Sequence, residues 1–122
     1  MNQVSLSLSR LNRRLRHHFS KDAVLCEYLK DSYFWTGQGI RGKICLWTGK
    51  SFRIEDDIVL DVACFTELLH NASLIHDDII DDDTERRGGE TFWKKQGRAK
   101  ALLVGDLLIA KAFEVASSVD CD

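Results

Sequence analysis

Apolar side chains recur at intervals of three and four residues along most of the chain, which is the spacing of amphipathic helices. The pattern is strongest over residues 55–81 and is repeated over residues 98–118. Weaker examples cover residues 4–18, 21–35 and 41–48. No segment shows convincing alternation with a period of two, so no sheet is expected. The absence of proline also favours uninterrupted helices. The pattern therefore predicts an all-α fold built from successive helices.

Polar residues and glycines between these segments mark the expected helix ends. Ser20 is a candidate N-cap for the second helix, and the glycines within residues 36–39 interrupt the chain after it. The third helix is expected to end near Gly49. The longest helix has two candidate starts: Ser51 as a cap, or the acidic run 55–57, whose charge suits the positive end of the helix dipole.

Two further segments bear on the fold: the polar segment between the two longest helices and the end of the last helix. Residues 82–91 are polar and are expected to form a loop with its turn at residues 88–89. The last helix carries apolar residues but is followed by no closing element. Its apolar surface needs neighbouring helices, a second subunit or further sequence to cover it.

Length and composition narrow the class of protein. A chain of 122 residues with 44% hydrophobic and 30% charged residues is typical of one small globular domain. The formal net charge of -2 gives no indication of nucleic-acid binding. No apolar run reaches the ~18 residues that span a bilayer, so no transmembrane segment is expected. The cysteines form no C-x-x-C pair and no zinc-site spacing, which favours reduced thiols in a cytoplasmic protein; they are Cys26, Cys45, Cys64 and Cys121.

The first 20 residues contain four arginines and several serines but no acidic residue. This composition suits an organelle-targeting peptide. It suits equally the exposed face of a first helix whose leucines are spaced to point partly inward. We therefore expect a cytoplasmic location, with organelle targeting as the minor alternative.

An acidic cluster follows the longest apolar segment, with six carboxylates within residues 77–85. Asp77 and Asp81 are four residues apart and therefore lie on one face of a helix, together with His70 and Ser73. Two carboxylates one turn apart form a hard oxygen site of the kind that Mg²⁺ takes, with phosphates and water completing its coordination.

Two arginines, Arg86 and Arg87, follow this cluster closely. Guanidinium groups match phosphate oxygens, so the combination suits a metal–diphosphate complex. The alternative interpretation is a solvated acidic helix end whose arginines only balance its charge.

These motifs resemble the first aspartate-rich region of the polyprenyl (trans-isoprenyl) diphosphate synthase family. The resemblance is strongest over residues 66–114, and the D-D-x-x-D motif followed by R-R-G is its most specific part. It rests on Leu68-Leu69-His70-Asn71-Ala72-Ser73-Leu74-Ile75-His76-Asp77-Asp78-Ile79-Ile80-Asp81, on Arg86-Arg87-Gly88 and on Val104-Gly105-Asp106-Leu107-Leu108. The resemblance implies an antiparallel helix bundle of the isoprenoid synthase type, with residues 1–122 forming the N-terminal part of the synthase domain.

The resemblance also implies an activity, the condensation of isopentenyl diphosphate with an allylic diphosphate. In this family Asp77 and Asp81 would bind the Mg²⁺ ions that hold the allylic diphosphate, with Asp78 supporting them. Arg86 would contact the same diphosphate. These four residues are the expected catalytic set.

Isopentenyl diphosphate would be bound by Arg87, His70 and Arg41. The positive charges would stabilise the departing diphosphate, the isopentenyl double bond would attack the allylic cation, and a proton would be lost. Small residues at Ala72 and Ser73, before the first aspartate, are similar to those of synthases with longer products.

The sequence departs from the family pattern in three places. Within residues 37–42 only Arg41 remains of three basic residues that the family usually has. Glu90 stands where the family usually has a proline. Family members are also more than twice as long, and their second aspartate-rich region is absent from this sequence.

Two alternatives therefore remain open. One is a non-catalytic helical subunit of a heteromeric synthase, and the other is a metal phosphohydrolase built on His76-Asp77 with His70 upstream. Family members commonly form dimers, so a homo- or heterodimer is expected. We expect Gly105 to allow close helix packing.

Overall fold

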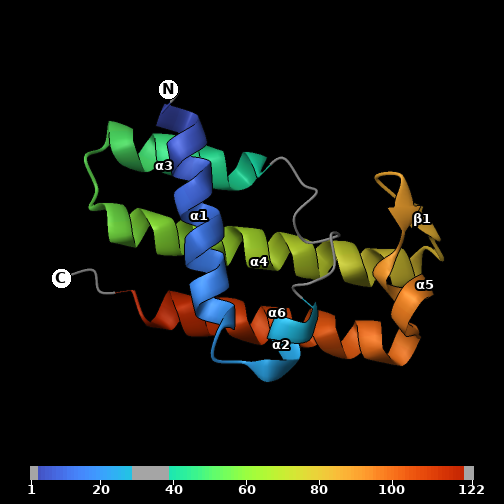
Figure 1. Cartoon of the computed structure of the whole chain (residues 1–122). Helices are drawn as coiled ribbons and strands as arrows, with labels where there is room; N and C mark the ends of the chain where they lie inside the picture. The colour runs from blue at the N-terminus through green and yellow to red at the C-terminus, as the bar shows by residue number, and fades with distance from the viewer. Residues whose placement is uncertain (1–2, 29–38, 120–122) are drawn as a thin grey trace.

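The computed structural model describes residues 3–28 and 39–119, with side chains from residue 8 to 27 and from 39 to 119. Almost all of the secondary structure is helical (Figure 1). The elements are α1 (Gln3–Phe19), α2 (Ala23–Tyr28), α3 (Ile40–Ser51), α4 (Asp56–Ile80), β1 (Glu85–Arg86), β2 (Gly89–Glu90), α5 (Phe92–Gln96) and α6 (Arg98–Ser117). The all-α prediction is confirmed.

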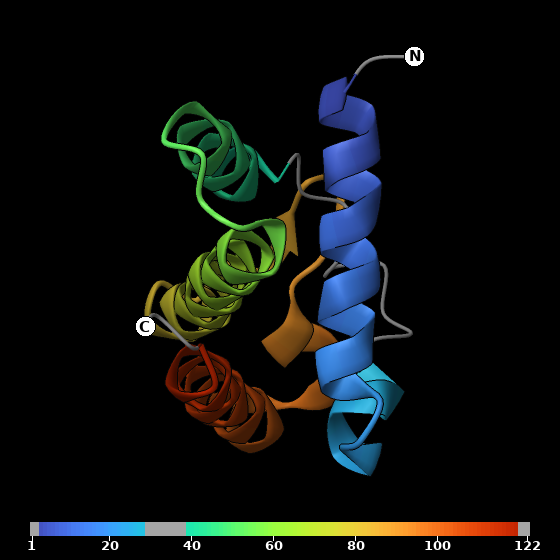
Figure 2. The same cartoon turned by 90° about the vertical axis from the view of Figure 1, so that its left-hand side faces the viewer.

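The helices form two layers. In the first layer α4 lies between α3 and α6 and runs antiparallel to both of them (Figure 1). α1 crosses one face of this layer and makes up most of the second (Figure 2). The hydrophobic core lies between the layers, where Leu11 and Leu15 of α1 pack with Leu68 of α4 and Leu108 of α6. Burial of such apolar surface is the main force that holds the bundle together.

The predicted boundaries of the two longest helices agree with the structure within one residue at each end. The acidic start of α4 is also confirmed, because Asp56 and Asp57 lie in its first turn. Ser51 is not its cap: it ends α3, and its hydroxyl donates to the carbonyl of Trp47.

The predicted cap of the second helix was wrong. Asp22, and not Ser20, caps α2, since its Oδ1 accepts from the backbone N–H groups of Val24 and Leu25. α3 ends at Ser51, close to the expected end near Gly49. Gly49 itself lies buried within the helix, where a Cβ would come 2.4 Å from a methyl carbon of Val59. This glycine allows α3 and the start of α4 to approach closely.

The segment between α4 and α6 is more ordered than a polar loop. β1 and β2 form a two-residue antiparallel ladder, so the expectation of no sheet was wrong. The turn consists of Arg87 and Gly88, both with positive φ, as a two-residue hairpin of type I′ requires. The short helix α5 was not predicted. The interruption at residues 36–38 and the end of the predicted helix 21–35 lie outside the described residues.

α4 is long and apolar enough to cross a membrane by length and composition alone. The sequence prediction of no transmembrane segment is therefore not confirmed by this test. Half of its most apolar window is buried inside the bundle, as in the core helix of a globular protein, which passes the same test.

Candidate functional site

Asp77 and Asp81 lie at the exposed C-terminal end of α4, as the spacing predicted. Asp77 is in the last turn and Asp81 is the C-cap, whose N–H donates to the carbonyl of Asp77 at 2.8 Å. The two residues are therefore one helical turn apart. Neither carboxylate forms an ion pair or hydrogen bond with any part of the chain that the structure describes.

A Schellman motif ends the helix just after this pair. The N–H of Asp82 donates to the carbonyl of Ile79 at 3.4 Å, and that of Asp83 donates to the carbonyl of Asp78 at 3.0 Å. Asp82 occupies the position at which glycine is usual, with a φ of 54°. The chain direction after Asp81 is thereby fixed.

Asp78 lies on a different side of α4 and is buried, with 1% of its surface exposed. Arg86 of β1 binds it in a fork: Nε lies 3.0 and 3.1 Å from the two carboxylate oxygens, and Nη2 lies 2.6 Å from one of them. Sequence analysis predicted a supporting role for Asp78 and a diphosphate contact for Arg86. The structure brings the two together and shows that Asp78 anchors the hairpin to the end of α4.

Arg41 at the start of α3 and His70 in the middle of α4 were predicted to share a ligand, and they are in contact. Nη1 of Arg41 lies 3.1 Å from Nε2 of His70. Because guanidinium can only donate, Nε2 accepts and the ring is neutral. Glu67, one turn earlier on α4, accepts from the N–H of Gly42 at 2.8 Å and holds this part of α3 in place.

The positive charges of the arginines predicted to bind diphosphate all act on His70. Desolvation by burial lowers the pKa of His70, and the positive charges of Arg41, Arg87 and Arg86 lower it further, against the opposing effect of Glu67. Three arginines from α3 and the hairpin therefore act on one position of α4. This is the environment that an anionic ligand would stabilise.

His76 is turned away from this region. Its Nε2 donates to the carbonyl of Leu102 at 3.1 Å and lies 3.5 Å from a carboxylate oxygen of Asp106. A Cβ on Gly105 would come 2.2 Å from the same nitrogen, so the glycine makes room for the ring. The expectation that Gly105 allows close packing is confirmed.

The sequence analysis missed a row of ion pairs between α1 and the start of α4. Arg10 pairs with Asp56 at 3.1 Å, and Arg14 pairs with Asp57 at 3.3 Å. Arg10 and Arg14 are four residues apart, as two residues on one helix face must be. That spacing was the available signal, but it gave no indication of the partner helix.

Asp61 is the centre of this contact. Nε and Nη2 of Arg14 bind its two oxygens at 2.9 and 3.0 Å, and Nε2 of His18 lies 2.9 Å from one of them. Burial alone would raise the pKa of Asp61, but the hydrogen bonds from Arg14 and His18 outweigh burial, and the pKa lies below its usual value.

His18, Asp61 and Cys64 together have ligand atoms within 4.8 Å of one another, the spacing of a metal site. Two observations argue against metal binding there. Arg14 occupies both oxygens of Asp61. Burial raises the pKa of Cys64 to about 12, so its thiol is protonated at neutral pH. We therefore assign this group to the packing of α1 on α4.

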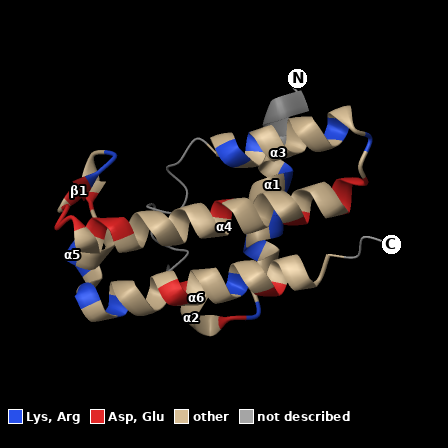
Figure 3. Ribbon diagram, turned by 180° about the vertical axis from the view of Figure 1, so that it is seen from behind, with Lys and Arg blue, Asp and Glu red and all other residues tan. Residues whose placement is uncertain are grey.

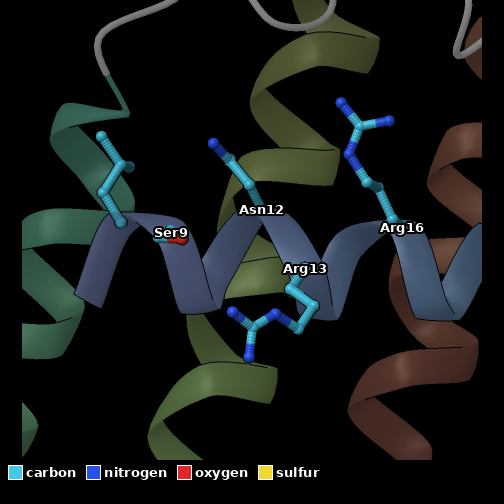
Figure 4. A pocket seen from close by; sticks show the side chains of 5 residues that line it. Ser9, Asn12, Arg13 and Arg16 are labelled. Carbon is cyan, nitrogen blue, oxygen red and sulfur yellow. The ribbon is translucent and has the colours of Figure 1, made fainter. Parts of the chain in front are cut away.

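A shallow hollow runs along α1, lined by Leu8, Ser9, Asn12, Arg13 and Arg16. In the close-up, Asn12 and Arg16 point to one side of the helix and Arg13 points to the other (Figure 4). The side chains do not converge on a common point, so the hollow does not have the geometry of a site. Among the described residues, two predicted groups do come together: Asp77 with Asp81 at the end of α4, and Arg41 with His70.

Curated relatives match most of this chain. A short chain isoprenyl diphosphate synthase of Methanocaldococcus jannaschii is 39% identical over 112 residues, which make up 92% of this chain and 34% of that protein. The chain thus spans about a third of this curated relative.

Two solved structures are similar over almost the whole chain. A geranyltranstransferase from Thermotoga maritima matches with a TM-score of 0.87 and 33% identity, over 97% of this chain and 46% of that one. A geranylgeranyl pyrophosphate synthetase from Geoglobus acetivorans matches with a TM-score of 0.86 and 28% identity, over 99% of this chain and 40% of that one. The family model for polyprenyl synthetase matches residues 22–122, and the chain belongs to the polyprenyl synthetase family.

Proposed function

We propose that the end of α4 is the part of a trans-prenyltransferase site that binds an allylic diphosphate through Mg²⁺ held by Asp77 and Asp81. The observation that carries this proposal is the contrast within one acidic cluster. Asp78 and Asp82 are paired with arginines, whereas the other four carboxylates are exposed and have no partner among the described residues. Of these four, only Asp77 and Asp81 lie one helical turn apart at the end of α4.

The donor set fits the metal. Mg²⁺ prefers carboxylate oxygens, uses one or two of them, and completes its octahedron with water and phosphate oxygens. Two exposed carboxylates without an arginine partner can take this role without breaking an existing ion pair. The bound metal would supply positive charge to the diphosphate as it leaves.

The cations from α3 and the hairpin would bind the second substrate. We propose that Arg41, His70 and Arg87 hold the diphosphate of isopentenyl diphosphate. The neutral ring of His70 orients Arg41 by accepting from it, and Arg87 is presented at the tip of a turn. Arg86 is held at the end of α4 by its fork with Asp78, and this position in the hairpin supports a contact with the allylic diphosphate.

These residues would bind the two diphosphates, orient them and neutralise their charge. The bond between the allylic carbon and the diphosphate breaks, the isopentenyl double bond attacks the resulting cation, and a proton is lost. Ala72 is buried and Ser73 is exposed, and both are small. Their size supports a pocket that admits a long hydrocarbon chain.

The rest of such an enzyme must come from outside the described helices, since the chain spans about a third of a curated relative. Large apolar side chains are exposed on α3 and α6, which supports packing against further helices or a second subunit; they include Ile44, Trp47, Leu103 and Phe113. We propose a homo- or heterodimer in the cytoplasm.

Two alternatives are less well supported. A purely structural subunit has no need of two exposed carboxylates without a partner among the described residues, together with three arginines whose charges act on His70. A phosphohydrolase built on His76-Asp77 would need His76 at the metal, but Nε2 of this ring is bound to the carbonyl of Leu102.

Titration of inorganic pyrophosphate into the chain by calorimetry, with and without Mg²⁺, tests the proposal. We expect binding only with Mg²⁺, and Asp77→Ala should weaken it at least tenfold while the helical circular dichroism is unchanged. Asp56→Ala is the matched control, because it removes an exposed acid from the other end of the same helix. Equal binding by Asp77→Ala and the wild type would contradict the assignment.

A further inference from the structure

Arg98, the first residue of α6, makes two contacts at the end of α4 and one with α5. Its Nη1 donates to the carbonyl of Ile79 at 3.1 Å, and its Nη2 pairs with the carboxylate of Asp82. Its guanidinium carbon also lies 4.2 Å from the ring centroid of Trp93, a cation–π contact. Figure 3 shows the acidic end of α4 beside the basic corner formed by α5 and the start of α6.

Trp93 is itself held in place. Its Nε1–H donates to the carbonyl of Asp83 at 2.7 Å. The same carbonyl accepts from the hydroxyl of Thr91, also at 2.7 Å, and Thr91 is fully buried. Arg98 binds Asp82 and Trp93 binds the carbonyl of Asp83, so these two side chains hold the two residues that directly follow Asp81.

The end of α4 needs such support. Asp82 has a φ of 54°, a conformation that costs energy for any residue with a Cβ. Five acidic residues within positions 77–83, at or near the negative end of the helix dipole, add repulsion. Arg98 offsets both effects, because it neutralises Asp82 and binds the carbonyl of Ile79, which also accepts from the N–H of Asp82.

We propose that Arg98 is a positioning residue for the acidic site, acting through the helix cap. By fixing Ile79 and Asp82 it keeps Asp81 one turn from Asp77. By pairing with the Asp82 carboxylate it also keeps that carboxylate from competing with Asp77 and Asp81 for the metal. This inference rests on the proposed function, although the cap itself does not.

Loss of the Arg98 charge and loss of the cap geometry are expected to change Mg²⁺ binding in opposite directions, so the two contributions can be measured separately. Removal of a cation beside an acidic site would by itself favour Mg²⁺ binding. A loosened cap would weaken binding. Arg98→Lys keeps the charge but loses the planar fork that reaches a carbonyl and a carboxylate together, so it isolates geometry.

The test has two readouts on the wild type, Arg98→Lys, Arg98→Ala and the control Lys100→Ala. Lys100 is an exposed cation of the same helix turn with no contact to the acidic end among the described residues. The first readout is hydrogen exchange of the Asp82 and Asp83 amides, followed by NMR. The second is the Kd of inorganic pyrophosphate at a fixed Mg²⁺ concentration.

We expect both Arg98 variants to exchange these two amides at least tenfold faster and to raise the Kd about tenfold, whereas Lys100→Ala changes neither. Unchanged exchange and an unchanged Kd in Arg98→Lys would overturn the proposal. A wild-type chain that fails to bind pyrophosphate would contradict the proposed function and not the cap, which amide exchange tests separately.

Discussion

The two ends of α4 both carry carboxylates, but these carboxylates are used differently (Figure 3). At the N-terminal end, Asp56, Asp57 and Asp61 all pair with arginines of α1. At the C-terminal end, Asp77 and Asp81 have no partner among the described residues. The same helix thus presents one set of acids to the protein and another set to solvent.

The helix dipole makes this difference informative. Carboxylates are favourable at a helix N-terminus and unfavourable at a C-terminus. Asp56 and Asp57, in the first turn, therefore stabilise the fold both by their ion pairs and by their position, whereas Asp61 does so by its ion pairs. The exposed pair at the C-terminus has neither advantage, and in the proposed site a bound cation would offset its charge. The paired acids of the first set and the exposed pair Asp77 and Asp81 should respond to mutation in opposite ways.

The largest change in stability is expected from Asp61→Asn. This substitution leaves the guanidinium of Arg14 without its carboxylate in a mostly buried contact. We expect the free energy of unfolding to fall by about 2–3 kcal/mol, measured by urea denaturation at pH 7. A loss below about 0.5 kcal/mol would show that this contact does not hold α1 on α4.

Asp57→Asn is the control for this variant. It removes an ion pair from the same arginine, but the Asp57 side chain is 66% exposed, so a loss of less than about 1 kcal/mol is expected. Acid should also separate the two variants. Because the pKa of Asp61 is lowered in the folded state, its contribution is present above about pH 4 and is lost as the pH falls further. Asp61→Asn should lack this acid-dependent loss.

A smaller effect of opposite sign is expected at the other end. Asp77→Asn removes an unpaired negative charge from the last turn of α4, so the free energy of unfolding should rise by about 0.3–1 kcal/mol in low salt. Urea denaturation in low and high salt measures it, since salt should diminish the gain. A loss of stability would mean that Asp77 has a structural partner.

The smallest effect concerns His70. Its pKa is lowered in the folded state, so the unfolded chain takes up its proton first as the pH falls. The contribution of His70 to stability is therefore complete above about pH 6.5 and is lost below it. His70→Gln should be less sensitive to pH than the wild type between about pH 6.5 and 5 in thermal melts. Parallel pH profiles would contradict a neutral His70.

Periodicity was sufficient for the long helices and insufficient for the short elements. α4 and α6 each contain several turns of apolar spacing, so their limits could be predicted. α5 has five residues and the hairpin strands have two each, which is too few for a period to be visible. The turn at Arg87 was obscured because a residue other than glycine takes a positive φ there.

The site was predictable where it depends on one helix and not where it depends on several. The four-residue spacing was enough to place Asp77 and Asp81 on one face. The burial of Asp78 depends on the hairpin that carries Arg86, and the cap depends on Arg98, sixteen residues beyond Asp82. Such contacts require the folded arrangement of separate elements, which spacing in the sequence does not specify.

Thermal unfolding of the wild type, Asp61→Asn and Asp77→Asn, each with and without Mg²⁺ and inorganic pyrophosphate, tests the central claim most directly. Ligands that bind the folded state raise the melting temperature. The account predicts that Asp61→Asn melts lower but keeps the rise given by the ligands, whereas Asp77→Asn melts no lower than the wild type and loses that rise. If both variants lost stability and kept the rise, the division of α4 into a structural end and a binding end would be contradicted.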